Sequence, residues 1–260
     1  MKLPKIRFLE MTLKENIDII KWTYFDDSDL LNIHDYTIQY FPELANIDKS
    51  LSKEKIYKII EKVVTDNYEK YKEKIKIESE RYNSIWIKYN EIYFEALSKY
   101  LNIKWPDNLE VIEASVGLIP VFPRYLESFS FSLSIGMEES QVIDVVAHET
   151  LHFLWFEKWK QLYPSCPKRE YDSPYITWQY SEMVTDPILN SEEINSILNI
   201  NEKSYDSFYE IKDGDLMLMD NIKKIYKSNK KIEDKIVEGF DYIKRILENQ
   251  KDEIRYDNKR

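Results

Sequence analysis

The stretch Val142-Ile-Asp-Val-Val-Ala-His-Glu-Thr-Leu-His-Phe-Leu-Trp-Phe156 has the pattern of a mostly apolar helix with two histidines and a glutamate set into it. His148 and His152 are four residues apart, so at 3.6 residues per turn their side chains leave one face of the helix, one turn apart. Two imidazoles placed in this way can bind one tetrahedral zinc ion. Glu149 follows the first histidine and can reach a water molecule on such an ion, which completes an H-E-x-x-H motif.

Histidine is scarce in this chain, which makes the motif more specific. There are three histidines in 260 residues, and two of them belong to H-E-x-x-H. The alternative is that both are packed core side chains, since valine, leucine, phenylalanine and tryptophan surround them. The third histidine, His34, is interpreted as an ordinary surface or packing residue, and we leave it out of the site.

A catalytic zinc site needs a third protein ligand and leaves the fourth position to water. The segment from Ile176 to Pro187 can form a helix that the proline helps to end. On such a helix Glu182 and Asp186 share one face, four residues apart. Glu182 can bind the metal, while Asp186 can orient a histidine through its other ring nitrogen. The alternative is a solvated acidic stripe on a surface helix, which is common in an acidic chain.

Together the two motifs resemble those of the gluzincin zinc metallopeptidases, of which thermolysin is a familiar member. The resemblance implies that His148, His152 and Glu182 bind Zn²⁺. It also implies that Glu149 is the general base for a zinc-bound water that attacks a peptide bond, and that Asp186 supports His148. The longer gap before Glu182 leaves room for an inserted loop, and no subfamily is identified.

The residues between the motifs suggest one further catalytic group. Tyr175 is the tyrosine best placed to donate a hydrogen bond to a developing oxyanion, as tyrosines do in related sites. The chain has twenty tyrosines, and most of them are packing residues. The loop 164–174 contains three prolines and the single cysteine, Cys166, and is expected to form the rim of the site.

The rest of the chain predicts an α+β fold. Residues 11–105 have helical periodicity almost throughout, with a capping box at Thr12–Glu15 and with two long helices, or one broken helix, between Pro42 and Pro106. After Pro106 the β-branched segments 109–114 and 116–122 are typical of short strands. We therefore expect a helical N-terminal region at 1–105. A zincin-like metallopeptidase domain follows at 106–260, with a small sheet packed on the H-E-x-x-H helix and a helical C-terminal tail.

A third strand is predicted from alternation in Ser128-Phe-Ser-Phe-Ser-Leu-Ser-Ile-Gly136. Its apolar residues should face a core and its serines the opposite side. In the gluzincin arrangement a strand just before the active helix borders the cleft and can pair with an extended substrate. The alternative is an ordinary amphipathic strand with a polar outer face.

Composition and charge indicate which classes of partner and which cellular location to expect. The net charge is −10 and the sequence pI is near 5.1, and no basic cluster stands out, which argues against a nucleic-acid partner. The N-terminus has no apolar core of signal-peptide length, and no apolar run is long enough to cross a bilayer. One cysteine excludes an internal disulfide framework. We expect a cytoplasmic protein without a membrane partner, whose oligomeric state the sequence does not determine.

The expected function is therefore that of a zinc metallopeptidase acting on a peptide or protein substrate. Two alternatives stay open. One is a regulatory protease with a single protein target, as in the ImmA/IrrE-type peptidases, which the motif pair also resembles. The other is a non-catalytic helical interaction protein with a structural or vestigial zinc site.

Overall fold

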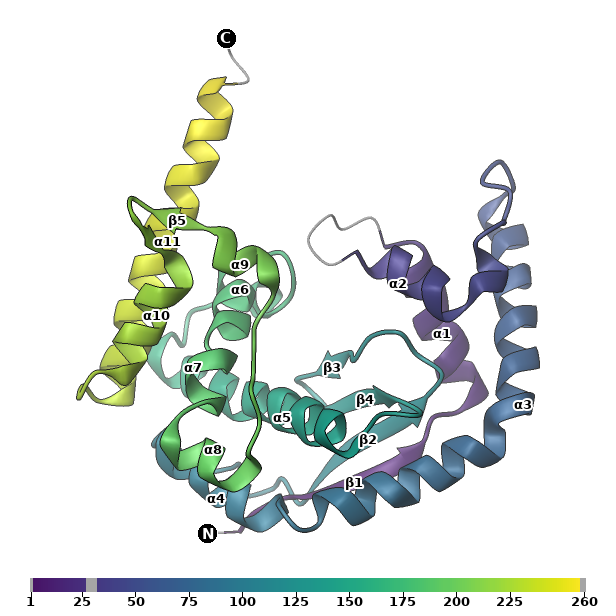
Figure 1. The fold of residues 1–260 in the computed structure, drawn as a ribbon, viewed down its shortest axis with the longest axis horizontal. Helices are drawn as coiled ribbons and strands as arrows, with labels where there is room; N and C mark the ends of the chain where they lie inside the picture. Colours follow the sequence, from purple (N-terminus) through teal and green to yellow (C-terminus); the bar gives the residue numbers. More distant parts are fainter. Residues whose placement is uncertain (1, 27–31, 258–260) are drawn as a thin grey trace. The chain divides into compact units, whose positions relative to one another are not determined.

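The computed structural model describes residues 2–26 and 32–257, with side chains described as far as Glu248. It confirms an α+β protein in which helices predominate and a small mixed sheet accompanies them (Figure 1). The chain divides into two compact units. The first, which we call the sheet unit, comprises residues 4–91 and 108–145; the second, the helical unit, comprises residues 1–3, 92–107 and 146–260. Each unit contains residues from both sides of position 105. The division into a helical region at 1–105 and a metallopeptidase domain at 106–260 stays a prediction.

The sheet unit is built on four strands in the order β1-β2-β4-β3. Their bounds are β1 Lys5–Glu10, β2 Val111–Gly117, β3 Arg124–Tyr125 and β4 Ser130–Ser134. The first three strands in this order are parallel, and β3 runs antiparallel to β4. The sequence-based division into strands at 109–114 and 116–122 is wrong, because one strand, β2, spans the junction. Its alternate residues Ile112, Ala114 and Val116 are fully buried, so the pattern is that of one interior strand.

The alternation predicted before the H-E-x-x-H helix corresponds to β4, but its polar side is not exposed. Phe131 and Leu133 are buried as expected, and so are Ser132 and Ser134. The hydroxyl groups of Tyr40 and Ser134 are hydrogen-bonded at 2.9 Å, which gives a buried serine a partner. Strand β3 pairs with the first residues of β4, so that part of β4 is not a free edge for an added strand.

The helices of the sheet unit follow the predicted N-terminal pattern. They are α1 Leu13–Tyr24, α2 Ile33–Tyr40, the 3-10 turn η1 Pro42–Leu44 and α3 Lys53–Trp86. The capping box is present: the Thr12 hydroxyl accepts a hydrogen bond from the backbone of Glu15, and the Glu15 carboxylate accepts one from the backbone of Thr12. The long helix α3 packs against α1 and β1 (Figure 1). It ends before α4, Asn90–Tyr100, so two α-helices lie between Pro42 and Pro106 as expected, but α4 is short, with 11 residues against 34 in α3.

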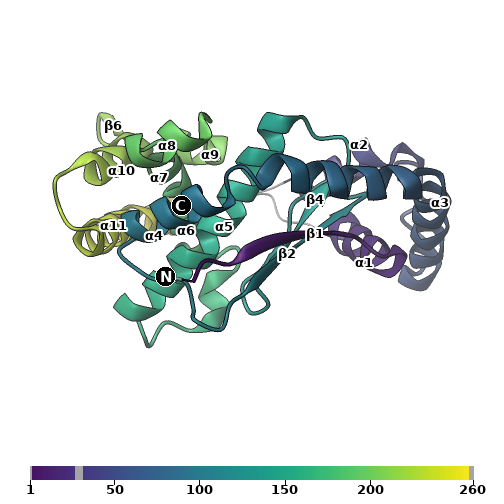
Figure 2. The ribbon, with the colours of Figure 1, turned by 90° about the horizontal axis from the view of Figure 1, so that it is seen from below.

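The helical unit contains most of the helix that carries the H-E-x-x-H motif. This helix, α5, spans Glu139–Leu162 and belongs to the helical unit from Val146 onward. The elements that follow it are η2 Lys168–Tyr171, α6 Ile176–Met183, α7 Thr185–Leu189, α8 Glu192–Leu198, α9 Asp206–Glu210, the hairpin strands β5 Lys212–Asp213 and β6 Leu216–Met217, α10 Leu218–Lys227 and α11 Ile232–Asp257. Helices α10 and α11 pack side by side (Figure 2). No helix in the described part of the chain is long and apolar enough to span a bilayer.

An aromatic core holds α5 against α6 and α11. The rings of Trp155 and Trp159 are stacked with their centroids 5.1 Å apart. Tyr180 of α6 meets Trp155 edge-on at 5.7 Å, and Phe240 of α11 meets Trp159 edge-on at 4.7 Å. Both tryptophans are almost fully buried. Side chains of this size dominate core energetics, so this cluster fixes α5 within the helical unit.

An ion pair between the buried Lys158 and the partly exposed Glu233 adds a second link between α5 and α11. The Lys158 ammonium group, almost fully buried, donates to the Glu233 carboxylate and to the backbone oxygen of Asn102. Burial raises the pKa of Glu233, but hydrogen bonds from Lys158, the Glu233 backbone and Asn102 outweigh it and lower this pKa from its ordinary 4.5 to about 2.

This pKa shift predicts how stability depends on pH. The folded-state pKa of Glu233 is depressed, so its contribution is complete above about pH 4.5 and is lost as the pH falls toward 2. At pH 7 the substitution Glu233→Gln should lower the free energy of unfolding by about 1.5–3 kcal/mol, the range for hydrogen bonds to charged groups. Urea denaturation between pH 7 and pH 3 measures the difference, which should narrow with acidity. Glu238→Gln, which removes an exposed pair with Lys230, is the control and should cost less than about 1 kcal/mol. A difference between Glu233→Gln and the parent that stays constant down to pH 3 would contradict the assignment.

Candidate metal centre

Three side chains predicted as metal ligands meet in the helical unit. His148 and His152 extend from α5 and Glu182 from α6. The two Nε2 atoms are 3.0 Å apart. A carboxylate oxygen of Glu182 lies 3.3 Å from Nε2 of His148, and the other lies 3.5 Å from Nε2 of His152. Residues separated by about thirty positions in the chain thus form one cluster of ligand-type atoms.

These spacings fit a tetrahedral metal ion. Zinc binds imidazole nitrogen and carboxylate oxygen at about 2.0–2.2 Å, so neighbouring ligand atoms lie about 3.3–3.5 Å apart along the edges of a tetrahedron. The separation of 3.0 Å between the two Nε2 atoms is close to such an edge, and each Nε2 atom has a different carboxylate oxygen of Glu182 at 3.3 or 3.5 Å. The donor set of two nitrogens and one carboxylate oxygen is one that zinc accepts.

The position of the proton on the neutral His148 ring determines whether its Nε2 atom can act as an acceptor toward the cluster. Nδ1 of His148 lies 2.9 Å from a carboxylate oxygen of Glu202. An ionised carboxylate only accepts hydrogen bonds, so Nδ1 carries the proton, and in the neutral ring Nε2 then has a free lone pair. That lone pair faces Nε2 of His152 and the Glu182 carboxylate. Two imidazole nitrogens and a carboxylate at these distances would repel one another as acceptors unless a proton or a cation lies among them.

The electrostatics of the cluster favour positive charge. Burial lowers the pKa of His148, but the carboxylates of Glu202, Glu182 and Glu149 raise it more, so this pKa lies well above its usual range. Glu182 and His152 are almost fully buried, whereas the His148 side chain is 22% exposed. The same negative field that favours a proton on His148 favours a divalent cation, and the opening of the cluster to solvent is on the His148 side.

Glu149, the predicted general base, is a buried residue of α5, adjacent in sequence to His148. Its carboxylate is close enough to His148 to raise the pKa of that ring. A charged carboxylate at 5% exposure is costly unless other groups or ions interact with it. Its position near the cluster, rather than on the outer face of α5, is compatible with the predicted role.

The structure corrects the place of Asp186. Helix α6 ends at Met183, and Asp186 lies in the separate short helix α7, which also contains Pro187. Proline lacks a backbone N–H and its ring clashes with the carbonyl group four residues earlier, so one continuous helix through Asp186 is disfavoured. Glu182 and Asp186 therefore belong to two different helices. Asp186 does not contact Nδ1 of His148; that atom meets Glu202 instead.

Asp186 has other partners. One carboxylate oxygen accepts from Asn190 at 2.9 Å. The other pairs with the Lys223 ammonium group at 2.7 Å and accepts from the Tyr209 hydroxyl group. Burial, together with this hydrogen bond to Asp186, raises the pKa of Tyr209 above its usual value. Asp186 is thus a structural anchor for the chain that follows Glu182.

Sequence reasoning missed Glu202. This residue follows α8 in a segment without secondary structure, and no periodic pattern connects it with either motif. The chain has 47 acidic residues, so one more glutamate carries no signal by itself. Only the packing of the segment against α5 and α7 brings it to His148.

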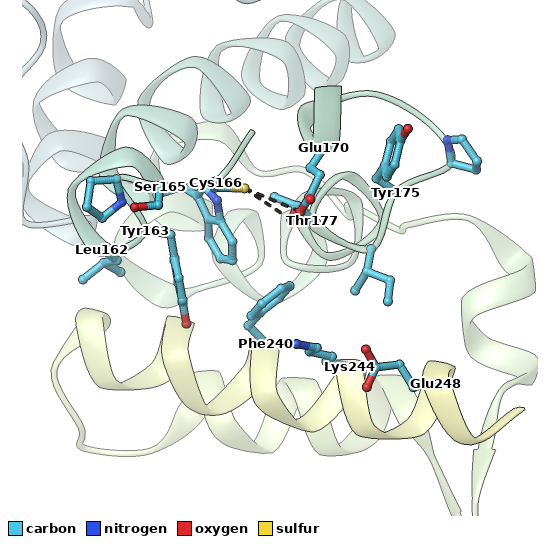
Figure 3. A pocket seen from close by; sticks show the side chains of 14 residues that line it. Leu162, Tyr163, Ser165, Cys166, Glu170, Tyr175, Thr177, Phe240, Lys244 and Glu248 are labelled. Carbon is cyan, nitrogen blue, oxygen red and sulfur yellow. Dashed lines mark hydrogen bonds between the residues drawn. The ribbon is translucent and has the colours of Figure 1, made fainter. Parts of the chain in front are cut away.

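Tyr175, the predicted oxyanion donor, lies elsewhere in the helical unit. It is the residue before the first turn of α6, seven positions before Glu182, which is about 10 Å along a helix axis. Its ring lines a pocket of about 750 Å³ with Trp159, Tyr163 and Phe240 (Figure 3). Cys166 also lines this pocket, and its thiol group lies 3.7 Å from the Glu170 carboxylate. A contribution of Tyr175 to catalysis stays a prediction, and we do not build on it.

The cluster predicts how metal content responds to mutation. His152→Ala removes one of two nitrogen ligands and should abolish binding of one zinc ion per chain, as measured by elemental analysis after dialysis. His34→Ala, the same substitution at the remaining histidine, should retain the metal. Full metal content in purified His152→Ala would exclude the cluster as the binding site.

Comparison with known proteins adds no relative. No protein-family model, no curated protein and no solved structure matches this chain. The functional interpretation therefore depends on the chemistry of the cluster.

Proposed function

We propose that this protein is a zinc-dependent metallopeptidase with a gluzincin-like, zincin-type catalytic core. His148, His152 and Glu182 would hold the metal. The observation that carries the proposal is the approach of two imidazole Nε2 atoms to 3.0 Å, with the Glu182 carboxylate beside both. Without a cation or a shared proton, this arrangement of buried acceptors would be unfavourable.

The number of ligands favours catalysis over a purely structural metal. Structural zinc sites generally use four protein ligands, whereas catalytic sites use three and leave one position open. The group of ligand-type side chains found among the described residues has three members. Partial exposure of His148 supports access for a small reactant from solvent.

The chemistry then divides between metal and protein. A bound zinc ion would polarise the carbonyl group of a substrate and make water more acidic. Glu149 would accept the proton of the attacking water and transfer it to the leaving amine. Glu182 and His152, both buried, would keep their donor atoms in place throughout. General acid–base catalysis of this kind contributes about 10²–10⁴-fold to the rate.

The substrate class follows from the resemblance of the two motifs to those of peptidases. The net charge of −10 would favour neutral or basic peptides by electrostatic steering. A cytoplasmic location is part of the same proposal. Two alternatives remain, and the following experiment separates them. One is a regulatory protease with one target, and the other is a non-catalytic protein with a structural or vestigial zinc site.

The substitution Glu149→Gln tests the proposed base. It should retain zinc, because the three ligands remain, and should lower the hydrolysis rate by about 10²–10⁴-fold, because a neutral amide cannot accept the proton. The measurement is digestion of a peptide library followed by mass spectrometry, with zinc content determined on the same samples.

Glu157→Gln is the matched control, since Glu157 lies on the same helix but pairs with the exposed Lys160. It should cleave at the parental rate. Parental activity in Glu149→Gln would contradict the proposed mechanism. A parent that holds zinc and cleaves no peptide in the library, but cleaves one cellular protein, would favour the single-target alternative. Zinc without any cleavage would favour the structural one.

A further inference from the structure

We infer that Glu202 is the residue that positions His148 for metal binding, and that Asp186 acts on His148 only through Asn190 and the backbone of Glu202. The inference rests on the proposed metal site. It assigns to a segment after α8 the supporting role that the resemblance places on the acidic residue four positions after Glu182.

The first step is the contact between Glu202 and the imidazole. The carboxylate of Glu202 lies 2.9 Å from Nδ1 of His148, and its side chain is 9% exposed. A hydrogen bond from Nδ1–H to a mostly buried carboxylate fixes both the ring orientation and the tautomer. Nε2 of His148 is then held as an acceptor toward His152 and Glu182.

The second step is the attachment of Glu202 itself. The Asn190 side chain binds the backbone of Glu202 on both sides: its oxygen accepts from the Glu202 N–H at 3.0 Å, and its NH₂ group donates to the Glu202 carbonyl oxygen at 2.7 Å. A carboxamide offers one acceptor and two donor hydrogens, so an asparagine can satisfy both backbone groups at once. This double contact fixes the point from which the Glu202 side chain extends.

The third step connects Asp186. The second NH₂ hydrogen of Asn190 is available to Asp186, which accepts from Asn190 at 2.9 Å. Asp186 is in turn held by Lys223 and Tyr209. The order of contacts is therefore Asp186, Asn190, Glu202, His148. Asp186 orients the side-chain amide of Asn190, and this amide holds the backbone of Glu202.

A parallel contact joins the same segment to the residue that supplies the third ligand. The hydroxyl group of Ser204 donates to the backbone oxygen of Glu182 at 2.9 Å, and the Ser204 N–H donates to the Tyr209 hydroxyl oxygen at 3.1 Å. The segment from Glu202 to Ser204 thus contacts a ligand side chain at one end and the backbone of a ligand residue at the other. Displacing it should disturb the metal site without removing any ligand.

The test measures metal affinity in the full chain, with zinc competed against a chelator and with Co²⁺ as a spectroscopic probe. Glu202→Ala should weaken zinc binding by about 10–100-fold, the usual effect of removing a group that supports a metal-bound histidine. It should also change the visible absorption of bound Co²⁺, because the His148 ring is no longer fixed. Glu202→Gln should recover part of the affinity, since its amide oxygen still accepts from Nδ1–H.

Two further variants separate the direct contact from the indirect one. Asn190→Ala should weaken zinc binding less than Glu202→Ala, because the carboxylate remains but is less well placed. Asp186→Asn should have the smallest effect of the three. Glu192→Ala, at an exposed acidic position at the start of α8, is the control and should keep the parental affinity and Co²⁺ spectrum.

The outcomes distinguish this inference from the proposed function. Parental affinity and spectrum in Glu202→Ala, or a larger loss in Asp186→Asn than in Glu202→Ala, would overturn the role of Glu202 and leave the metal site intact. His152→Ala is expected to bind neither zinc nor Co²⁺. If the parent chain also binds neither, the metal site is refuted together with this inference. If Glu202→Ala does not fold, Glu202→Met, which keeps the length of the side chain but offers no oxygen to Nδ1–H, decides in the same way.

Discussion

The approach of two imidazole nitrogens and a carboxylate inside the helical unit is the constraint on which the functional interpretation depends. The two Nε2 atoms are 3.0 Å apart, and the Glu182 carboxylate lies beside both. Groups of this kind are stable in a buried place only with a proton or a cation among them. The hydrogen bond to Glu202 places the proton of a neutral His148 ring on Nδ1, so Nε2 of His148 supplies no proton to the cluster in that state. In the proposed site a cation between these groups would satisfy all three and would leave one coordination position for chemistry.

The rest of the helical unit keeps these groups in place. Stacked and edge-on aromatic rings fix α5 against α6 and α11, and the ion pair of the buried Lys158 with Glu233 holds the C-terminal part of α5. Large rings have few rotamers and bury much area, so a helix packed in this way keeps its register. The proposed ligand side chains therefore extend from well-packed helices, whereas the Glu202 carboxylate comes from a segment without secondary structure that side-chain hydrogen bonds hold.

Local patterns in the sequence predicted much of this arrangement, and their failures have physical reasons. The capping box before α1, a long helix between Pro42 and Pro106 and a helix through His148 and His152 depend on neighbouring residues, and they were confirmed. The serines of β4 were expected on an exposed face, but side chains distant in sequence cover them. Asp186 was expected on one helix with Glu182. The structure divides this stretch into α6 and α7, and Asp186 binds Asn190, Tyr209 and Lys223 instead of His148.

The sequence by itself determined which residues can bind a metal, because histidines four apart on a helix share a face whatever the helix packs against. It also identified Glu182, since an acidic residue on a second helix is the kind of third ligand such a pair requires. Only the tertiary structure decided which carboxylate supports His148. Helical periodicity does not extend through a break or an irregular segment, so the contact between Glu202 and His148 arises from packing between parts of the chain 54 residues apart.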